Sequence, residues 1–503
     1  MKKTSFLAFD IGASSGRALK GTLGDQGLKL EEILRFTNTM VSRQGRLYWD
    51  SERIFHFIKM GIKAAVGAGA NIESIGLDTW GVDFGLVDGR GELVAQPFAY
   101  RDARNASAMN SCFSLIPRDR IYGLTGIQFL QFNSLYQLYA LKVYNPRFLD
   151  KARRLLFMPD LFNFWMTGKK TTEFSFATTS QLFNPFSGEW EREIFDAVGI
   201  SMDLMNPVAQ AGKKLGELKS GLVEELCLSD PIPVVLTATH DTASAVAAVP
   251  TRESDWAFIS CGTWSIMGIL RLRPIVDSHS LEKNFTNEGG WDGSFRFSKN
   301  ISGLWLLQEC RRIWSLRENK TLSYRALTES AENAPAFRSL VDPDAPVFLK
   351  PEDMPGAIQS FCRSSDQPVP EQKGEFVRCI LESLALKYRY VLDELRRASG
   401  VQINRLHIIG GGVSNRLLCR FTAAATGLPV HAGPAEATAV GNLMIQALAL
   451  GAVGSAEEMK DVIFRSFRPQ LYSPGNTQIW ERASGGFTDL VEWSGEKESH
   501  ERI

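Results

Sequence analysis

The sequence predicts an α/β protein with two domains. Its 503 residues are more than a single hydrophobic core usually organises. Apolar, β-branched runs repeatedly end in small and polar residues and are followed by segments suited to helices. A turn of small residues follows a strand-like run at residues 10–16 and again at 261–265, about half the chain apart. We therefore expect a duplicated fold, with domains at residues 1–250 and 251–460 and a peripheral extension at 461–503.

The composition excludes several classes of protein. Lysine plus arginine and aspartate plus glutamate both number 56, so we expect no basic surface for nucleic acid. The seven cysteines include no CxxC pair, which argues against a zinc site or a disulfide framework. The apolar run at residues 6–9 is too short for a signal peptide, and the uncharged stretch 437–456 contains Asn442 and Gln446, so we interpret it as a buried helix. These features indicate a cytoplasmic protein without a membrane partner, and they do not distinguish a monomer from an oligomer.

The first small-residue turn has the composition of a phosphate-binding loop. A strand at residues 5–9 runs into Asp10, and glycines and serines follow. Glycine lets the backbone approach a phosphate, N–H groups and hydroxyls donate to its oxygens, and an acid at this place can hold a hydrated metal ion. The same pattern also fits a plain hairpin turn between two edge strands.

A second strand, at residues 75–77, ends in a polar and aromatic cluster. Trp80 and Phe84 have rings that can pack against the face of a sugar, and Asp83 can accept hydrogen bonds from its hydroxyls. A tryptophan in the core beside a surface ion pair explains the pattern equally well.

The third strand of this kind leads directly into a candidate catalytic acid. Residues 234–236 are apolar and β-branched, His240, Asp241 and Thr242 follow, and small residues suited to a helix come next. Open α/β sheets bind ligands at the carboxyl ends of their strands. A carboxylate placed there can take the proton from a hydroxyl that attacks a phosphoryl group. The alternative is that Asp241 or Thr242 is only a helix N-cap.

The second half of the chain repeats the strand-and-turn pattern. A strand at residues 256–260 precedes the turn that contains Thr263, and a charged segment at 252–256 marks the junction between the domains. A strand at 406–409 precedes three glycines at 410–412, which allow a flat group such as adenine or ribose to approach the backbone. A packing turn is the alternative for these glycines.

Taken together, the motifs are recognisable. The sequences DIGASSGR, DTWGVDF, AYRDAR, HDTASAV, GTWSIMG, NEGG, LWLLQ, IIGGG and AGPAEATAVGN occur in an order that resembles the FGGY carbohydrate kinases, from Asp10 to about Gln446. The resemblance implies two actin-like (ribonuclease H-like) ATPase domains flanking a central catalytic cleft, with the sugar mainly on the first domain and ATP mainly on the second. The motifs look most like those of members that phosphorylate the 1-hydroxyl of L-rhamnulose with ATP and Mg²⁺ in L-rhamnose catabolism.

The resemblance also implies roles for individual residues. Asp241 is placed as the general base, and Asp10 lies where the family has an acid near the metal, acting through water. Sugar contacts are implied for His240, Thr242, Gly81 and Asn300. Nucleotide contacts are implied for Ala13, Ser14, Ser15, Gly16, Arg17, Thr263, Gln308 and Gly411. Gln131 stands where the family pattern has proline, which affects the expected shape of the sugar pocket.

Two other functions fit parts of the pattern. L-Fuculose or another deoxy-ketose is an alternative substrate, because its kinases share the His-Asp-Thr and Gly-Thr-Trp sequences. From a different class, a sugar-responsive actin-like ATPase would use Asp241 to activate water and would form no sugar phosphate. Sugar-dependent release of ADP separates these classes.

Overall fold

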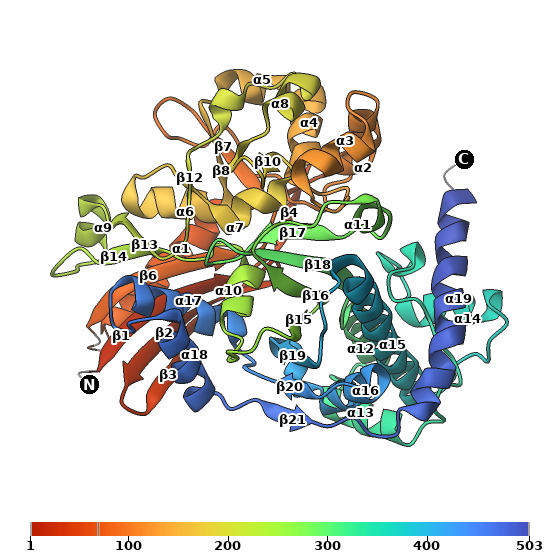
Figure 1. Ribbon diagram of the computed structural model, residues 1–503. Helices are drawn as coiled ribbons and strands as arrows, with labels where there is room; N and C mark the ends of the chain where they lie inside the picture. The colour runs from red at the N-terminus through yellow and green to blue at the C-terminus, as the bar shows by residue number, and fades with distance from the viewer. Residues whose placement is uncertain (1–2, 68, 70, 501–503) are drawn as a thin grey trace. The chain divides into compact units, whose positions relative to one another are not determined.

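The computed structural model describes residues 3–67, 69 and 71–500, which form two compact units (Figure 1). The first unit contains the chain up to Arg252 together with Leu270–Phe297 and Ala437–Arg468. The second contains Glu253–Ile269, Ser298–Glu436 and the chain from Pro469 onward. The chain therefore passes between the units several times, whereas the sequence analysis expected one junction and one extension. The first division does fall within the charged segment at residues 252–256.

A six-stranded sheet organises the first unit, in the order β13-β14-β6-β1-β2-β3. Its central strand β1 pairs in parallel with β6 and antiparallel with β2, and β6 pairs in parallel with β14. Strand β1 is buried on both faces, which explains its almost continuous apolar sequence. The strands are β1 (Thr4–Ile11), β2 (Ser15–Gly24), β3 (Gly27–Thr37), β6 (Ile72–Thr79), β13 (Lys213–Glu217) and β14 (Pro233–Leu236).

Helix α1 covers part of this sheet because its apolar residues recur at helical spacing. In α1, the buried residues Ile54, Ile58 and Ile62 share one face and pack in the same core as Leu7 and Phe9 of β1. The other helices of the unit before residue 253 are α2 (Arg104–Phe113), α3 (Arg118–Thr125), α4 (Ser134–Tyr144), α5 (Pro146–Lys151), α6 (Met158–Thr167), α7 (Phe174–Ala177), α8 (Arg192–Val198), α9 (Ser220–Glu225) and α10 (Asp241–Ala247), and α1 spans Ser51–Gly67. The short paired strands are β4 (Met40–Arg43), β5 (Arg46–Trp49), β7 (Phe84–Val87), β8 (Arg154–Phe157), β9 (Thr172–Glu173), β10 (Phe183–Asn184), β11 (Glu189–Trp190) and β12 (Val208–Ala209).

The helix α17 (Ala437–Ala449) comes from near the end of the chain and packs on the sheet of the first unit (Figure 1). The prediction of a buried helix here is confirmed, and its polar residues explain its position. The Asn442 amide donates to Asp78 Oδ2 at 2.6 Å, and the Gln446 amide donates to the Leu7 carbonyl at 3.1 Å. Gly441 permits the contact with α10, because a Cβ there would lie 1.8 Å from the Ser244 carbonyl oxygen. The next helix, α18 (Ala456–Ser466), packs beside β3.

The second unit repeats the strand pattern of the first. Its strand β15 (Trp256–Cys261) pairs antiparallel with β16 (Trp264–Arg271) and in parallel with β19 (Arg405–Ile409), which pairs in parallel with β20 (Val430–Ala432). Strand β21 (Gln470–Tyr472) pairs antiparallel with β20 at the edge of the sheet, just as β13 pairs antiparallel with β14 at the edge of the first sheet. Both small-residue turns are therefore hairpin turns after a central strand, not an edge strand. This correspondence agrees with the expected duplication.

Long helices accompany that second sheet. The longest, α15 (Lys373–Ser399), packs against α13, α16 and α19. Residues after 468 belong to this unit, since Trp480 and Phe487 of α19 are buried in a core with Leu386. The helices are α12 (Trp305–Arg317), α13 (Tyr324–Glu332), α14 (Met354–Ser364), α16 (Arg416–Thr426) and α19 (Gln478–His500).

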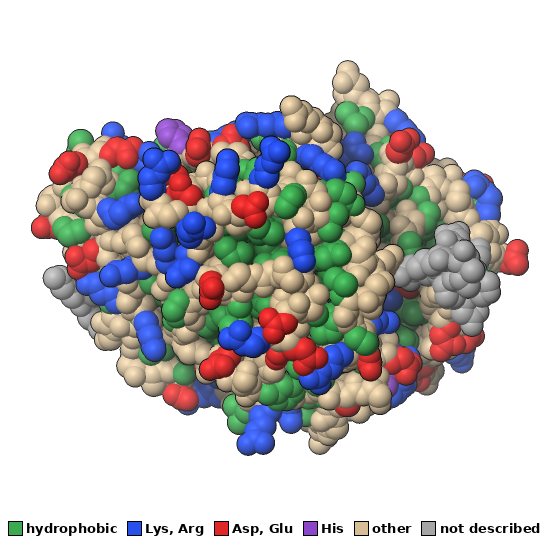
Figure 2. Space-filling view, turned by 90° about the horizontal axis from the view of Figure 1, so that it is seen from above, with side chains coloured by type: hydrophobic (Ala, Val, Ile, Leu, Met, Phe, Trp, Pro, Cys, Tyr) green, Lys and Arg blue, Asp and Glu red, His purple; other side chains and the backbone are tan. Residues whose placement is uncertain are grey.

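Two segments near the division between the units complete the architecture. Helix α11 (Ser278–Glu282) and strand β17 (Thr286–Gly289) belong to the first unit. Strand β18 (Phe295–Ser302) begins in the first unit and continues into the second. On the face shown in Figure 2, basic and acidic side chains are intermixed. No helix among the described residues is long and apolar enough to cross a membrane.

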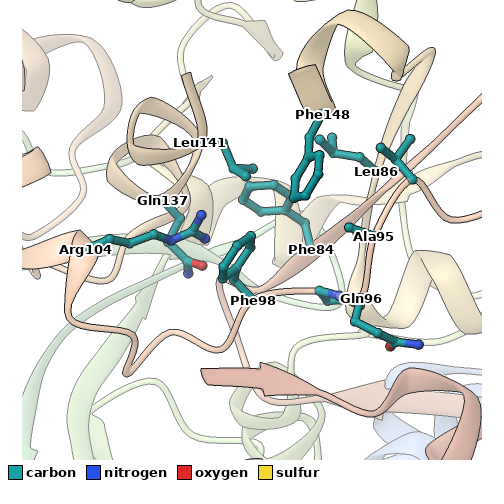
Figure 3. A pocket seen from close by; sticks show the side chains of 12 residues that line it. Phe84, Leu86, Ala95, Gln96, Phe98, Arg104, Gln137, Leu141 and Phe148 are labelled. Carbon is teal, nitrogen blue, oxygen red and sulfur yellow. The ribbon is translucent and has the colours of Figure 1, made fainter. Parts of the chain in front are cut away.

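A small cavity in the first unit is lined by β7, the segment that follows it, α4 and α5 (Figure 3). Its volume is about 20 Å³, which is room for about one water molecule. Phe84, Phe98 and Phe148 line it, and the side chains of Arg104 and Gln137 approach from one side. A sugar or a nucleotide is far too large for this space.

Candidate active site

Asp241 is the first residue of α10, five residues beyond the end of β14. The N-cap position belongs to His240, whose side chain makes no capping hydrogen bond. The backbone N–H of Thr242 donates to Asp241 Oδ1 at 2.5 Å, and the Thr242 hydroxyl donates to the same oxygen at 3.1 Å. Within the described chain no hydrogen bond is made to Oδ2, and the side chain is 33% exposed. Asp241 is therefore not an N-cap, and one of its oxygens is accessible for proton transfer.

Three acids gather at the carboxyl ends of neighbouring strands. Asp10 at the end of β1 is in register with Asp78 on β6, and Asp241 follows β14. Burial and the negative charge of Asp10 raise the pKa of Asp241 to about 6. Burial and the same charge raise the pKa of Asp78 well above its ordinary value. A carboxyl with a pKa near 6 is mostly ionised at neutral pH yet basic enough to accept a proton.

Asp10 and its neighbour Asp78 suit a divalent cation held through water. Oxygen ligands are those that Mg²⁺ prefers, and Mg²⁺ commonly keeps several of its own waters. Asp78 Oδ1 is buried without a hydrogen-bond partner among the described residues, although Oδ2 accepts from Asn442. Asp10 pairs with Arg17 at 2.6 Å and retains slight exposure. No group of three or more His, Cys, Asp or Glu residues in the described chain is arranged to ligate a metal directly.

The turn after β1 holds the predicted phosphate-binding residues in a closed hairpin. The Gly12 N–H donates to the Ser15 carbonyl at 2.9 Å, and the Asn38 side chain donates to the Gly12 carbonyl at 2.9 Å. Ser14 is exposed, Ala13 and Ser15 are half-buried, and Gly16 is buried. A Cβ at Gly16 would lie 2.1 Å from the Phe36 ring, so glycine is required there.

His240 sits in a buried network beside Asp241. Its Nδ1 lies 2.9 Å from Arg296 Nη2 and its Nε2 lies 3.4 Å from Asp241 Oδ1. Arg296 Nη2 also pairs with Glu288 Oε2 at 3.1 Å. Gly81 lies against the ring, since a Cβ there would be 3.2 Å from His240 Nε2. The structure thus brings together the predicted residues His240, Asp241, Thr242 and Gly81.

Trp80 and Asp83 have mainly internal contacts. The Trp80 ring is 5% exposed and packs on Trp49 with a centroid distance of 4.3 Å. Asp83 is fully buried: Oδ2 accepts from both indole N–H groups at 2.5 and 2.9 Å, and Oδ1 accepts from Gln137 at 2.8 Å. Burial raises the pKa of Asp83 to about 6 in spite of these donors. This geometry corrects the expectation of direct sugar contact by the Asp83 carboxylate and favours the alternative of a tryptophan in the core.

The remaining predicted residues lie in the second unit. The Thr263 hydroxyl donates to Gln308 Oε1 at 3.0 Å, which brings the turn after β15 to the first turns of α12. A Cβ at Gly412 would lie 2.2 Å from Cys261 Sγ, whereas a Cβ at Gly411 would meet nothing within 4 Å. The backbone at Gly411 therefore borders open space, close to the turn that contains Thr263. Asn300 is half-buried on the second-unit part of β18.

Comparison with known proteins decides the family. The model described as the N-terminal domain of the FGGY family of carbohydrate kinases matches residues 5–248, and that of the C-terminal domain matches residues 257–450. The chain belongs to the FGGY family of carbohydrate kinases. The expected sugar-kinase activity and the expected fold class, two actin-like domains, are both confirmed.

Relatives within the FGGY family match almost the whole chain. The rhamnulokinase of Bacteroides thetaiotaomicron is 44% identical over 489 residues, which cover 97% of this chain and 100% of that protein. The rhamnulokinase of Halalkalibacterium halodurans is 41% identical over 466 residues, covering 93% and 98%. Among solved FGGY-like folds, a ligand-bound xylulose kinase from Lactobacillus acidophilus has a TM-score of 0.80 at 15% identity, covering 99% of this chain and 98% of that one. Glycerol kinase from Plasmodium falciparum with ADP has a TM-score of 0.77 at 16% identity, covering 98% of each chain.

Several residues around this candidate site were not predicted from the sequence. Arg296 and Glu288 complete the network around His240, and Asn38 closes the first turn. Arg296 had a visible signal, because it is a charged residue between Phe295 and Phe297 in an otherwise strand-like run. Glu288 lies in the NEGG motif, but no role was predicted for it. No sequence pattern around Asn38 indicated its contact with the first turn.

Proposed function

We propose that this kinase transfers the γ-phosphoryl group of ATP to the 1-hydroxyl of L-rhamnulose, with Asp241 as the general base. The substrate is supported by 44% identity along the whole length of a rhamnulokinase. The role of Asp241 is supported by its exposed Oδ2 and its raised pKa.

The reaction needs positioning and charge compensation more than covalent chemistry. The sugar hydroxyl donates its proton to Asp241 Oδ2 as its oxygen forms the new O–P bond, and the bond to the β-phosphate oxygen breaks to release ADP. Thr242 holds Oδ1 through two hydrogen bonds, which orients the carboxylate. His240 and Gly81 form the adjoining surface for the sugar.

The nucleotide contacts follow from the two hairpin turns. Backbone N–H groups of both turns and the hydroxyls of Ser14 and Ser15 can donate to phosphate oxygens, and the Thr263 hydroxyl can do so once it turns from Gln308 Oε1. Gly411 leaves space for the nucleoside. Mg²⁺, when bound near Asp10, would offset the charge of the phosphate oxygens. Arg17 orients Asp10 through the ion pair at 2.6 Å.

Coupled ADP release with Mg-ATP tests the substrate. L-Rhamnulose, L-fuculose, L-ribulose and glycerol are compared, and the product is examined by ³¹P NMR. We expect kcat/KM to be highest for L-rhamnulose, with phosphate on its 1-oxygen. A preference for L-fuculose would keep the kinase reaction and overturn the proposed substrate. ADP release without a sugar phosphate would instead indicate the regulatory ATPase class.

A further inference from the structure

Three buried side chains in contact with one another lead to the proposed catalytic carboxylate. Glu288 on β17 pairs with Arg296 on β18, and Arg296 contacts His240, the residue that precedes Asp241. Arg296 has no exposed surface, and Glu288 and His240 are 6% and 7% exposed. All four residues belong to the first unit. An ion pair this deeply buried lowers the stability of the fold unless its geometry is good and further hydrogen bonds satisfy its groups.

The contact between Arg296 and His240 determines which ring nitrogen carries the proton. A guanidinium has five N–H donors and no acceptor, so the nitrogen that faces it must accept a hydrogen bond. Arg296 Nη2 lies 2.9 Å from His240 Nδ1, and Nδ1 is therefore unprotonated. The proton of a neutral ring then resides on Nε2, which lies 3.4 Å from Asp241 Oδ1 and faces Gly81.

The same network keeps the ring neutral. Burial, together with the positive charge of Arg296, lowers the pKa of His240 well below its ordinary value. Glu288 is 3.5 Å from His240 Nδ1, yet its charge is already matched by Arg296. The backbone of β17 fixes the guanidinium from another direction, because Arg296 Nε donates to the Gly289 carbonyl at 3.0 Å.

We propose that Arg296, held by Glu288, is a positioning residue that fixes His240 as its neutral Nε2–H tautomer. His240 then offers a hydrogen-bond donor beside the carboxylate of Asp241, and the ligand group that meets it must be an acceptor, such as a carbonyl or hydroxyl oxygen of a ketose. The consequence for catalysis rests on the proposed role of Asp241. The tautomer itself does not.

Other charged groups also face this network and have to be considered in its pH dependence. Asp241 directly follows His240 at the start of α10. The charges of Asp241, Glu288 and Glu173 all act on Arg296. The charged groups that contact the ring are Asp241 of α10, Glu288 of β17 and Arg296 of β18. Glu173 of β9 acts on the ring's partner Arg296, and Asp10 of β1 and Asp78 of β6 interact with Asp241. Removing only Arg296 would leave Glu288 uncompensated, so the test changes both residues.

The experiment uses the full chain with ¹⁵N-labelled histidine. The sequence has six histidines, and His240→Asn identifies the signal of interest. Wild type is expected to show the Nε2–H pattern without titration from pH 5 to 8. In Glu288→Gln/Arg296→Met we expect His240 to lose this fixed tautomer and to titrate within that range. Arg296→Lys keeps a donor cation and is expected to restore the wild-type pattern at least in part.

Kinetics on the same variants provide the second readout. The double variant is expected to lower kcat about tenfold and to raise KM for the ketose, while KM for ATP stays within twofold. Its pH profile should gain an ionisation near the ordinary value for histidine, about 6.5. Arg104→Met, which removes another buried guanidinium of the same unit, controls for the general cost of such a change.

Each outcome decides the proposal. An Nδ1–H signal in wild type, or a double variant that folds and keeps the wild-type tautomer, would overturn it. If the double variant fails to fold by thermal melting, the wild-type and Arg296→Lys spectra still test the tautomer. A fixed Nε2–H tautomer together with an Asp241→Asn variant of normal activity would instead reject the proposed base and leave the tautomer established.

Discussion

Asp241→Asn should stabilise the fold while it abolishes most of the activity. The pKa of Asp241 is about 6, against 3.8 for a free side chain, so the folded protein opposes its ionisation. Two pKa units correspond to about 3 kcal/mol, and because the side chain is one-third exposed, solvent screening reduces the cost to about 1–2 kcal/mol. Asparagine can still accept from Thr242 through its oxygen, so the local geometry should persist.

The sign of this effect depends on pH. Below the unfolded pKa the carboxyl is protonated in both states, and wild type and variant should have similar stability. Between pH 3.8 and about 6 the unfolded state loses its proton first, so wild-type stability falls as pH rises, and the full cost is present above the folded pKa. The variant carries no such cost, and its advantage should grow over this window to a Tm difference of about 1–3 °C.

Thermal melting from pH 4 to 8 and steady-state kinetics check both parts. We expect kcat to fall by ~10²–10⁴-fold, and wild-type kcat/KM to decline below about pH 6 as the base is protonated. Asp230→Asn, in an exposed loop, is the matched control. A constant stability difference across the pH range would refute the ionisation cost, and a kcat within a few-fold of wild type would refute the general-base role.

Four further substitutions test the rest of the site. Thr263→Val removes a hydroxyl donor and should raise KM for ATP about tenfold, in proportion to one lost hydrogen bond, with a smaller effect on KM for the sugar. Gly412→Ala should lower Tm, because its Cβ would lie 2.2 Å from Cys261 Sγ, whereas Gly411→Ala should leave Tm unchanged and raise KM for ATP, because its Cβ would enter open space. Asp83→Asn should destabilise the protein by about 2 kcal/mol, measured by thermal melting, since every group around this carboxylate is a donor.

Particular results would contradict these expectations. A Thr263→Val enzyme with an altered KM only for the sugar would remove this turn from the nucleotide site. Equal effects of the two glycine substitutions on Tm would contradict the packing around Cys261. An Asp83→Asn protein as stable as wild type would show that the buried charge costs as much as its hydrogen bonds contribute.

The sequence predicted well the features that depend on local chemistry. The strand before Asp241, the helix over 437–449 and the hairpin turn after Asp10 all follow from apolar runs that end at small or polar residues. The three candidate site residues at 240–242 could be predicted as one group because they are consecutive in the sequence.

Features set by distant partners could not be predicted in this way. Trp80 and Asp83 resemble a sugar site when only the local sequence is considered. In the fold, the Trp49 ring packs on Trp80 and its indole N–H donates to Asp83, so both residues are buried in the core. Asn38 and Arg296 act on residues far away in the sequence, and only the folded sheet brings them together. Likewise, the membership of residues 437–468 in the first unit rests on contacts to β1, β6 and α10.

The insertion of α17 has a consequence for the way the protein is made. The first unit needs Asn442 for the Asp78 side chain and Gln446 for the Leu7 carbonyl, yet these residues leave the ribosome near the end of synthesis. At about 5–20 residues per second, the completed strands β1 and β6 wait on the order of twenty to seventy seconds for their last helix. During that interval the nascent chain exposes an apolar sheet face, which is the kind of surface that chaperones bind. A protein cut after Arg252 would lack this helix permanently, together with Leu270–Phe297 of the same unit, and we expect it to aggregate.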